Sequence, residues 1–276
     1  MPTAAAPTID LAGARMPALA LGTWPMDDAE TAAAVDSALG LGYRHIDTAE
    51  NYGNERGAGE GIRRSGIPRA EVFITTKFNR AHHSIDGARR AFDASCERLG
   101  VDTLDLLLVH WPNPDQDRYV DAVRGIAALQ AEGRVRALGV SNFTAAHLNR
   151  LLDAGLTPAV NQIQLDPEHT RAELQAVHRA LGIVTTAYTP LGRGGAFLAA
   201  PAITAAAAAH GKTPAQVTLR WHVQQGNAAA PKSADPGRQL ENLEIFDFAL
   251  TDLEMAAISA LDVGAPLHHD PDTFGH

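Results

Sequence analysis

Four side chains able to take part in proton transfer lie near the ends of apolar stretches in the sequence. Asp47 lies near the end of the stretch over 43–49, and Tyr52 follows five residues later in a loop. Lys77 and His110 end the next two apolar stretches. A tyrosine phenol has a pKa of about 10, too high for an efficient acid at neutral pH, and a nearby ammonium group lowers that pKa. We therefore expect Tyr52 to donate a proton and Lys77 to make it more acidic. Asp47 would hold Lys77 in place, and His110 would hydrogen-bond a carbonyl oxygen and orient it.

The same residues admit two other interpretations. His45 and Asp47 form a His-x-Asp pair near the end of a stretch, and His110 could supply a third ligand to a zinc ion, as in a metal-dependent barrel hydrolase. In that case Lys77 would need another role. A catalytically silent binding protein is the second alternative.

These side chains meet only if the apolar stretches are neighbouring parallel strands. Eight such stretches follow a small hairpin over 9–17, and each is followed by a helical pattern. The predicted strands cover 18–24, 43–49, 72–78, 104–110, 135–142, 160–165, 183–189 and 228–232, and the predicted helices between them cover 28–39, 55–65, 84–99, 119–130, 144–153, 171–181, 202–210 and 214–225. Eight parallel strands with helical crossovers close into a (β/α)8 TIM barrel of the α/β class, with the active site at the C-terminal ends of the strands. Patterns over 238–244 and 252–261 predict extra C-terminal helices, and we expect one barrel domain over residues 1–276.

An open, doubly wound sheet is the alternative architecture. It would normally carry a glycine-rich fingerprint after its first strand, and Gly22-Thr-Trp-Pro-Met does not match G-x-G-x-x-G.

The composition restricts the class of protein further. The chain has 276 residues, of which 45% are hydrophobic, so it can bury a large core. A net charge of −9 without a run of Lys and Arg argues against a nucleic-acid partner, and no apolar run reaches the ~18 residues of a membrane helix. The single cysteine, Cys96, excludes an intrachain disulfide and fits a reducing compartment. The N-terminal residues lack the pattern of a signal peptide, so we expect a cytoplasmic protein. We also expect it to be a monomer.

Eight motifs, in order along nearly the whole chain, resemble the aldo-keto reductase superfamily. They are Gly42-Tyr-Arg-His-Ile-Asp-Thr-Ala49, Tyr52-Gly-Asn-Glu55, Thr75-Thr-Lys77, Val109-His-Trp-Pro112, Gly139-Val-Ser-Asn-Phe143, Asn161-Gln162, Tyr188-Thr-Pro-Leu-Gly192 and Pro231-Lys-Ser233. The chain is most similar to the short-loop bacterial branch that includes 2,5-diketo-gluconate reductases. The resemblance implies an NADPH-dependent oxidoreductase, without a metal, that reduces small aldehydes, dicarbonyls or keto-sugars to alcohols. The family's catalytic tetrad falls on Asp47, Tyr52, Lys77 and His110, with Tyr52 as general acid.

The resemblance also implies which residues bind the cofactor. Ser141, Asn142 and Gln162 match the residues that bind the nicotinamide carboxamide, and Tyr188 matches the aromatic ring that stacks on the nicotinamide. At the adenosine end, Lys232, Ser233 and Arg238 match the set that holds the 2′-phosphate, and Glu241 and Asn242 match the adenine contacts. Further residues expected to line the cofactor are Gly22, Thr23, Leu191, Gly192 and Gly194.

The expected substrate pocket is lined by Trp24, Asn51, Phe78 and Trp111. Two further features concern the phosphate residues and the pocket. Asp235 lies between Lys232 and Arg238, where its charge would repel a phosphate. The tail over 264–276, including His268, His269 and Phe274, could fold over the pocket.

Overall fold

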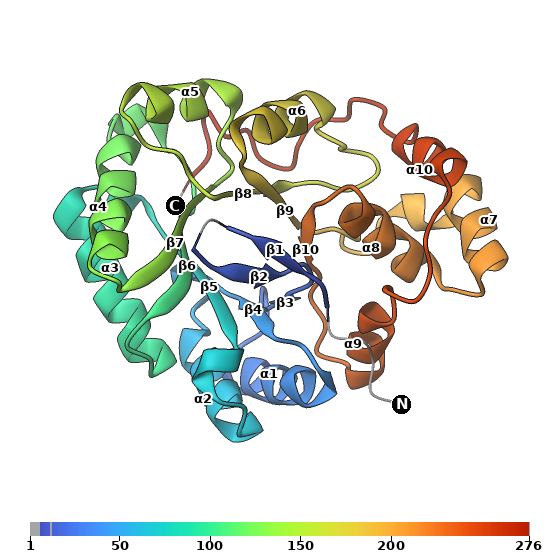
Figure 1. Ribbon diagram of the computed structural model, residues 1–276, viewed down its shortest axis with the longest axis horizontal. Helices are drawn as coiled ribbons and strands as arrows, with labels where there is room; N and C mark the ends of the chain where they lie inside the picture. Colours follow the sequence, from blue (N-terminus) through green and yellow to red (C-terminus); the bar gives the residue numbers. More distant parts are fainter. Residues whose placement is uncertain (1–5, 12, 276) are drawn as a thin grey trace.

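The computed structural model describes residues 6–11 and 13–275; residues 1–5, 12 and 276 lie outside the description, and with them one residue of the predicted hairpin turn and the last residue of the tail. Eight parallel strands form one sheet in the order β3 to β10 (Figure 1). They are β3 (Leu21–Gly22), β4 (His45–Asp47), β5 (Phe73–Phe78), β6 (Leu104–Val109), β7 (Val135–Ser141), β8 (Val160–Gln164), β9 (Val184–Tyr188) and β10 (Ala228–Ala230). Parallel bridges from Leu19 to Ala229 and from Gly22 to Lys232 join the first strand to the last, so the barrel closes as predicted.

Helices surround the barrel on the outside (Figure 1). They are α1 (Asp28–Leu41), α2 (Glu55–Ser65), α3 (Ile85–Leu99), α4 (Tyr119–Ala131), α5 (Ala145–Asp153), α6 (Ala172–Leu181), α7 (Pro201–His210), α8 (Pro214–Gln224), α9 (Pro236–Leu243) and α10 (Asp252–Ser259). Side-chain caps set several helix starts: Asp27 accepts from the backbone of Glu30, and Ser84 accepts from the backbone of Gly87. The predicted helices are therefore confirmed to within two residues at most ends.

The hairpin of β1 (Thr8–Asp10) and β2 (Arg15–Pro17) covers the N-terminal end of the barrel. In Figure 1 it lies across the middle of the ring of strands. Leu11, Ala14 and Met16 pack against interior side chains such as Phe73 and Leu106. The hairpin thus fills one end of the barrel, and the polar strand ends lie at the other.

Strand alternation separates two layers of side chains. The larger apolar cluster, which includes Ile74, Phe78 and Phe92, lies between the strands and the helices. Thr75 and Lys77 point to the opposite face of β5, into the barrel, where they meet His45 and Asp47.

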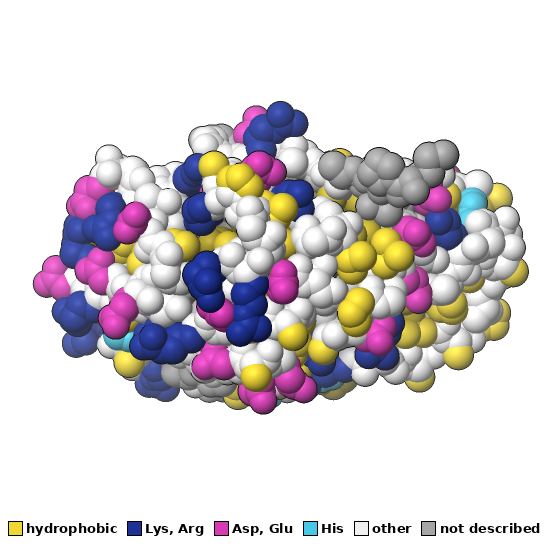
Figure 2. All heavy atoms as spheres, turned by 90° about the horizontal axis from the view of Figure 1, so that it is seen from below, with side chains coloured by type: hydrophobic (Ala, Val, Ile, Leu, Met, Phe, Trp, Pro, Cys, Tyr) yellow, Lys and Arg dark blue, Asp and Glu magenta, His cyan; other side chains and the backbone are white. Residues whose placement is uncertain are grey.

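On the flank seen in Figure 2, where α1 and α2 lie, Lys and Arg side chains are interspersed with Asp and Glu. Within the described residues, none of the helices combines the length and apolar character needed to traverse a bilayer.

Candidate active site

The predicted proton-transfer residues meet at the C-terminal ends of β4 and β5. The ammonium nitrogen of Lys77 lies 2.6 Å from Asp47 Oδ1, 2.9 Å from the backbone oxygen of Thr48 and 3.4 Å from the hydroxyl of Tyr52. Lys77 is 1% exposed and Asp47 is 4% exposed, so this ion pair is almost entirely removed from water. The phenol and the ammonium are therefore within reach of each other, as the sequence predicts.

His110 joins this group from the end of β6. Its ring lies edge-on to the Tyr52 ring, with 5.9 Å between the ring centroids. Its backbone nitrogen donates to the carbonyl of Phe78, and its backbone oxygen accepts from the side-chain amide of Asn142. Three adjacent strands and the loop after β4 thus supply the four residues.

The net direction of the Tyr52 pKa differs from the sequence-based expectation. Burial raises the pKa of Tyr52, and this effect outweighs the opposing attraction of Lys77, so the pKa lies above 10.0 rather than below it. For Lys77, burial lowers the pKa, but Asp47 and Tyr52 together raise it above its ordinary value. The site therefore holds a protonated phenol next to a charged ammonium group.

Asn54 fixes the loop that carries Tyr52, a role that was not predicted from the sequence. Its side-chain nitrogen donates to the carbonyls of Thr23 and Met26, and its oxygen accepts from the hydroxyl groups of Thr23 and Thr48. Asn54 is fully buried, so the short helix η1 (Glu50–Tyr52) is tied to the ends of β3 and β4. The only signal in the sequence was its place inside the motif that follows Tyr52.

The residues expected at the nicotinamide carboxamide lie beside this group. Gln162 donates its amide to Asp47 Oδ2 over 2.6 Å, so one side chain of this set touches the tetrad directly. Ser141 donates to the backbone oxygen of Gln162. Asn142 donates to Ser141 Oγ and accepts a 2.8 Å hydrogen bond from the hydroxyl of Tyr188. The side chains of Ser141, Asn142 and Tyr188 are therefore linked in one chain of hydrogen bonds, and the backbone oxygen of Gln162 joins Gln162 to it. Side-chain amides such as those of Asn142 and Gln162 can both donate to and accept from an amide ligand.

Lys232, Ser233 and Arg238 come together around the start of α9. Lys232 and Arg238 are exposed, and neither forms an ion pair within the described part of the chain. Ser233 is buried. Its hydroxyl donates to the backbone oxygen of Asp235 and accepts from the backbone nitrogen of the same residue. The carboxylate of Asp235 accepts from the backbone nitrogen of Arg238 and caps the helix. Two unpaired cations at a helix N-terminus suit a phosphate, and Asp235 competes with it for the same end of the helix.

The remaining predicted cofactor residues lie in three places: at the end of β3, in the turn after β9 and on α9. Thr23 is buried against Asn54, and Gly22 forms part of the barrel closure. Leu191, Gly192 and Gly194 form a tight turn after β9, in which both glycines have positive φ angles of 57° and 84°. Glu241 accepts from the hydroxyl of Thr213, and Asn242 is buried near Tyr43.

The expected substrate residues divide into two groups. Trp24 is 44% exposed, with the guanidinium group of Arg193 above its ring at 4.6 Å, and Asn51 is exposed next to Tyr52. Phe78 is fully buried in the layer between strands and helices, on the opposite face of β5 from Lys77. The structure therefore does not bring Phe78 together with the tetrad, because successive residues of a strand point to opposite faces.

Trp111 lies under the C-terminal tail. The centroid of its ring lies 4.7 Å from that of Phe274 and 6.1 Å from that of His269. The rings of His269 and Phe274 are stacked, with 3.9 Å between their centroids. The backbone of His268 also donates to Gln164 at the end of β8. The tail thus lies over the same end of the barrel as the tetrad, in agreement with the expectation from the sequence.

His45 does not serve the hydrolase alternative. Both of its ring nitrogens are engaged, one 3.0 Å from the carbonyl of Pro17 and the other 2.9 Å from the hydroxyl of Thr75. Within the described residues, no group of three or more His, Cys, Asp and Glu side chains could hold a metal ion.

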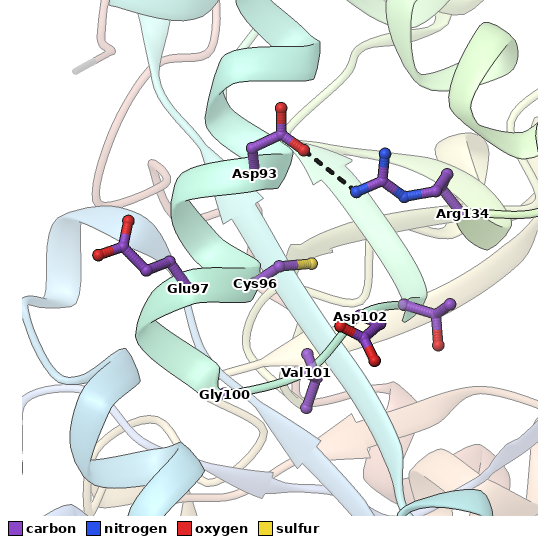
Figure 3. Close-up of a pocket in the computed structure, with 8 residues that line it drawn as sticks. Asp93, Cys96, Glu97, Gly100, Val101, Asp102 and Arg134 are labelled. Atoms are coloured by element: carbon purple, nitrogen blue, oxygen red, sulfur yellow. Dashed lines mark hydrogen bonds and ion pairs between the residues drawn. The ribbon is translucent and has the colours of Figure 1, made fainter.

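Figure 3 shows a surface hollow near the N-terminal ends of β6 and β7, at the end of the barrel away from the tetrad. It is lined by the end of α3, the turn before β6 and Arg134, which pairs with Asp93 over 3.1 Å. Burial raises the pKa of the Cys96 thiol there to about 12, so this cysteine is unreactive at neutral pH. The hollow is separate from the tetrad and adds nothing to its chemistry.

Comparisons with known proteins agree with this geometry. A model of the aldo/keto reductase family matches residues 18–263. An aldo-keto reductase of Mycolicibacterium smegmatis is 47% identical over 263 residues, which is 95% of each chain. A morphine 6-dehydrogenase of Pseudomonas putida is 46% identical over 94% of this chain and 92% of its own.

Solved structures of aldo-keto reductases and related proteins also resemble this chain. An aldo/keto reductase from Brucella melitensis is 44% identical, with a TM-score of 0.89 over 93% of this chain and 100% of its own. A point mutant of Gox0644 in complex with NADPH is 40% identical, with a TM-score of 0.90 over 95% of both chains. A putative 2,5-diketo-D-gluconic acid reductase B is 37% identical, with a TM-score of 0.90 over 96% of this chain and 95% of its own.

Proposed function

Since this chain belongs to the aldo/keto reductase family, we propose that it reduces aldehyde and ketone carbonyl groups with NADPH and that Tyr52 is the proton donor. The observation that carries the proposal is the position of the Tyr52 hydroxyl, 3.4 Å from a buried, charged Lys77. The ring of His110 lies beside it. A proton donor and a second polar group in one water-poor site suit a carbonyl oxygen that gains negative charge.

Each member of the tetrad has a separate task. Tyr52 gives its proton to the substrate oxygen, and Lys77 stabilises the phenolate that this leaves behind. Asp47 keeps Lys77 charged in its buried position. His110 hydrogen-bonds the carbonyl oxygen and directs it toward Tyr52.

The donor set fits NADPH. The two unpaired cations Lys232 and Arg238 would hold the 2′-phosphate at the start of α9. Asn142 and Gln162 would hold the carboxamide, and Tyr188 would offer its ring to the nicotinamide. When bound, NADPH supplies the hydride.

Small aldehydes, dicarbonyls and keto-sugars are the proposed substrates. The names of two similar proteins support alcohol or carbonyl substrates. One is a morphine 6-dehydrogenase and the other is a putative 2,5-diketo-D-gluconic acid reductase B. NADPH oxidation measured with a panel of such compounds, together with steroids, would identify the class. A monomer in the cytoplasm is part of the same proposal and rests on the sequence.

The variant Tyr52→Phe tests the role of the phenol. We expect kcat for reduction to fall about 10²- to 10⁴-fold, the range for a lost general acid, while the Kd of NADPH stays within about twofold. Tyr119→Phe is the matched control, because Tyr119 is a buried tyrosine on α4. Turnover by Tyr52→Phe equal to that of the control would reject Tyr52 as the acid.

A further inference from the structure

A buried histidine behind the site takes part in a hydrogen-bonded chain that the reaction itself does not use. His178 lies on α6 and is fully buried. Its Nε2 is 2.9 Å from the side-chain nitrogen of Asn161 on β8, and its Nδ1 is 2.8 Å from the hydroxyl of Thr185 on β9. The histidine therefore joins one helix to two strands of the barrel.

The backbone of Phe143 fixes the orientation of the Asn161 amide. The Asn161 nitrogen donates to the carbonyl of Phe143 over 2.8 Å, and its oxygen accepts from the backbone nitrogen of Phe143 over 3.3 Å. Because the Asn161 nitrogen can only donate, Nε2 of His178 must accept. Nδ1 then carries the proton and donates to Thr185. One tautomer of a neutral histidine satisfies the whole chain.

Phe143 directly follows Asn142, one of the residues expected to bind the nicotinamide carboxamide. Asn142 has a φ angle of 64°, in the left-handed region that L-residues other than glycine seldom adopt. Its side chain lies among Ser141, the backbone oxygen of His110 and the hydroxyl of Tyr188. A backbone clamp on the next residue holds Asn142 in this conformation.

We propose that His178 is a positioning residue for the nicotinamide end of the cofactor site, acting through Asn161 and the backbone of Phe143 on Asn142. The inference rests on the proposed function, because it takes Asn142 as a carboxamide contact. Burial, with the nearby charges of Arg171 and Arg179, lowers the pKa of His178 to about 4. The ring is therefore neutral at physiological pH, and Nε2 is available as an acceptor.

The position of His178 predicts that its replacement weakens binding of the nicotinamide end of the cofactor and not of the adenosine end. His178→Leu removes the acceptor, so the Asn161 amide is held only by its two hydrogen bonds to the backbone of Phe143 and its position becomes less defined. We expect the Kd of NADPH to rise about five- to tenfold, the size of one misplaced neutral hydrogen bond. The Kd of adenosine 2′,5′-bisphosphate, which reports only the adenosine end, should stay within about twofold. His178→Gln restores an acceptor at a similar reach, so its two Kd values should resemble those of the wild type.

A purely structural role would give a different result. Ile163→Ala is the matched control, because Ile163 is a buried, apolar residue of the same strand whose side chain cannot hydrogen-bond Asn161 or His178. It should lower the unfolding temperature and leave the ratio of the two Kd values unchanged. If folded His178→Leu also leaves that ratio unchanged, the inference is overturned.

Two further outcomes are decided in advance. If His178→Leu does not fold, Asn161→Ser replaces it, and a ratio equal to that of the wild type in this variant would overturn the inference. If the wild-type protein binds neither ligand, the proposed function fails and this inference fails with it. Wild-type binding of both ligands together with an unchanged ratio in the variants rejects only the role of His178.

Discussion

Replacing Lys77 by methionine would isolate the contribution of its charge. Methionine is unbranched and apolar, so Lys77→Met removes the ammonium group that lies 3.4 Å from the hydroxyl of Tyr52. At that distance a unit positive charge attracts a full phenolate by about 5 kcal/mol at an effective dielectric constant of about 20. If about half of that charge has developed in the transition state, the barrier rises by about 2.5 kcal/mol, which corresponds to a loss of about 70-fold in kcat.

The same change also destabilises the fold. It leaves the carboxylate of Asp47 buried with Gln162 as its remaining side-chain donor. Removing one partner of a buried ion pair typically lowers the free energy of unfolding by about 3–5 kcal/mol, so we expect about 3 kcal/mol here because Gln162 remains. Chemical denaturation would measure this loss.

The assay is steady-state reduction of the best aldehyde at neutral pH, with the Kd of NADPH measured in parallel. Lys212→Met is the control, because Lys212 pairs with an exposed Asp247 outside the tetrad. We expect its kcat to be unchanged. A folded Lys77→Met protein with kcat within about threefold of the wild type would refute the electrostatic role assigned to Lys77, since the expected loss is far larger.

Three further predictions concern pH and the phosphate site. Because burial keeps the pKa of Tyr52 above 10.0, Tyr52 stays protonated at neutral pH, so kcat for reduction should be flat from about pH 6 to 9 and fall as the pH rises beyond that range; a fall centred between about pH 7 and 8 would contradict this assignment. Arg238→Ala should weaken NADPH by about tenfold or more and NADH little, because only NADPH offers the 2′-phosphate; equal losses in two fluorescence titrations would exclude the phosphate contact. Asp235→Asn should keep the α9 cap, since asparagine caps as well as aspartate, and should tighten NADPH by about threefold through removal of one negative charge; unchanged NADPH affinity would show that Asp235 does not face the phosphate.

The fold could be predicted from the sequence because the hydrophobic pattern and the positions of the polar residues both indicated a barrel of parallel strands. Apolar stretches of strand length alternated with helical patterns along the chain, and residue types that suit N-caps, Asp27 and Ser84, precede two of the helices. Polar residues at strand ends identified the tetrad, because parallel strands bring their C-terminal ends to one rim.

What the sequence could not give depends on contacts between distant residues. The direction of the Tyr52 pKa is set by how much burial opposes Lys77, which residue spacing does not report. Asn54 acts through Thr23 and Met26, which lie 31 and 28 positions earlier in the chain. The same holds for the helix cap formed by Asp235, because residue type alone indicates a negative charge near the phosphate residues and not its hydrogen bond to the backbone of Arg238.

Gly22 marks the seam at which the first and last strands meet. A Cβ atom there would lie 2.9 Å from the backbone oxygen of Ala230, closer than real side chains come. Thr23 and Trp24 follow the end of β3 on one side of this seam, and Lys232 and Ser233 follow β10 on the other. A side chain at position 22 would push β3 away from β10 beside Thr23, Lys232 and Ser233, three residues that we propose to bind the cofactor. We therefore expect even Gly22→Ala to raise the Kd of NADPH in a fluorescence titration.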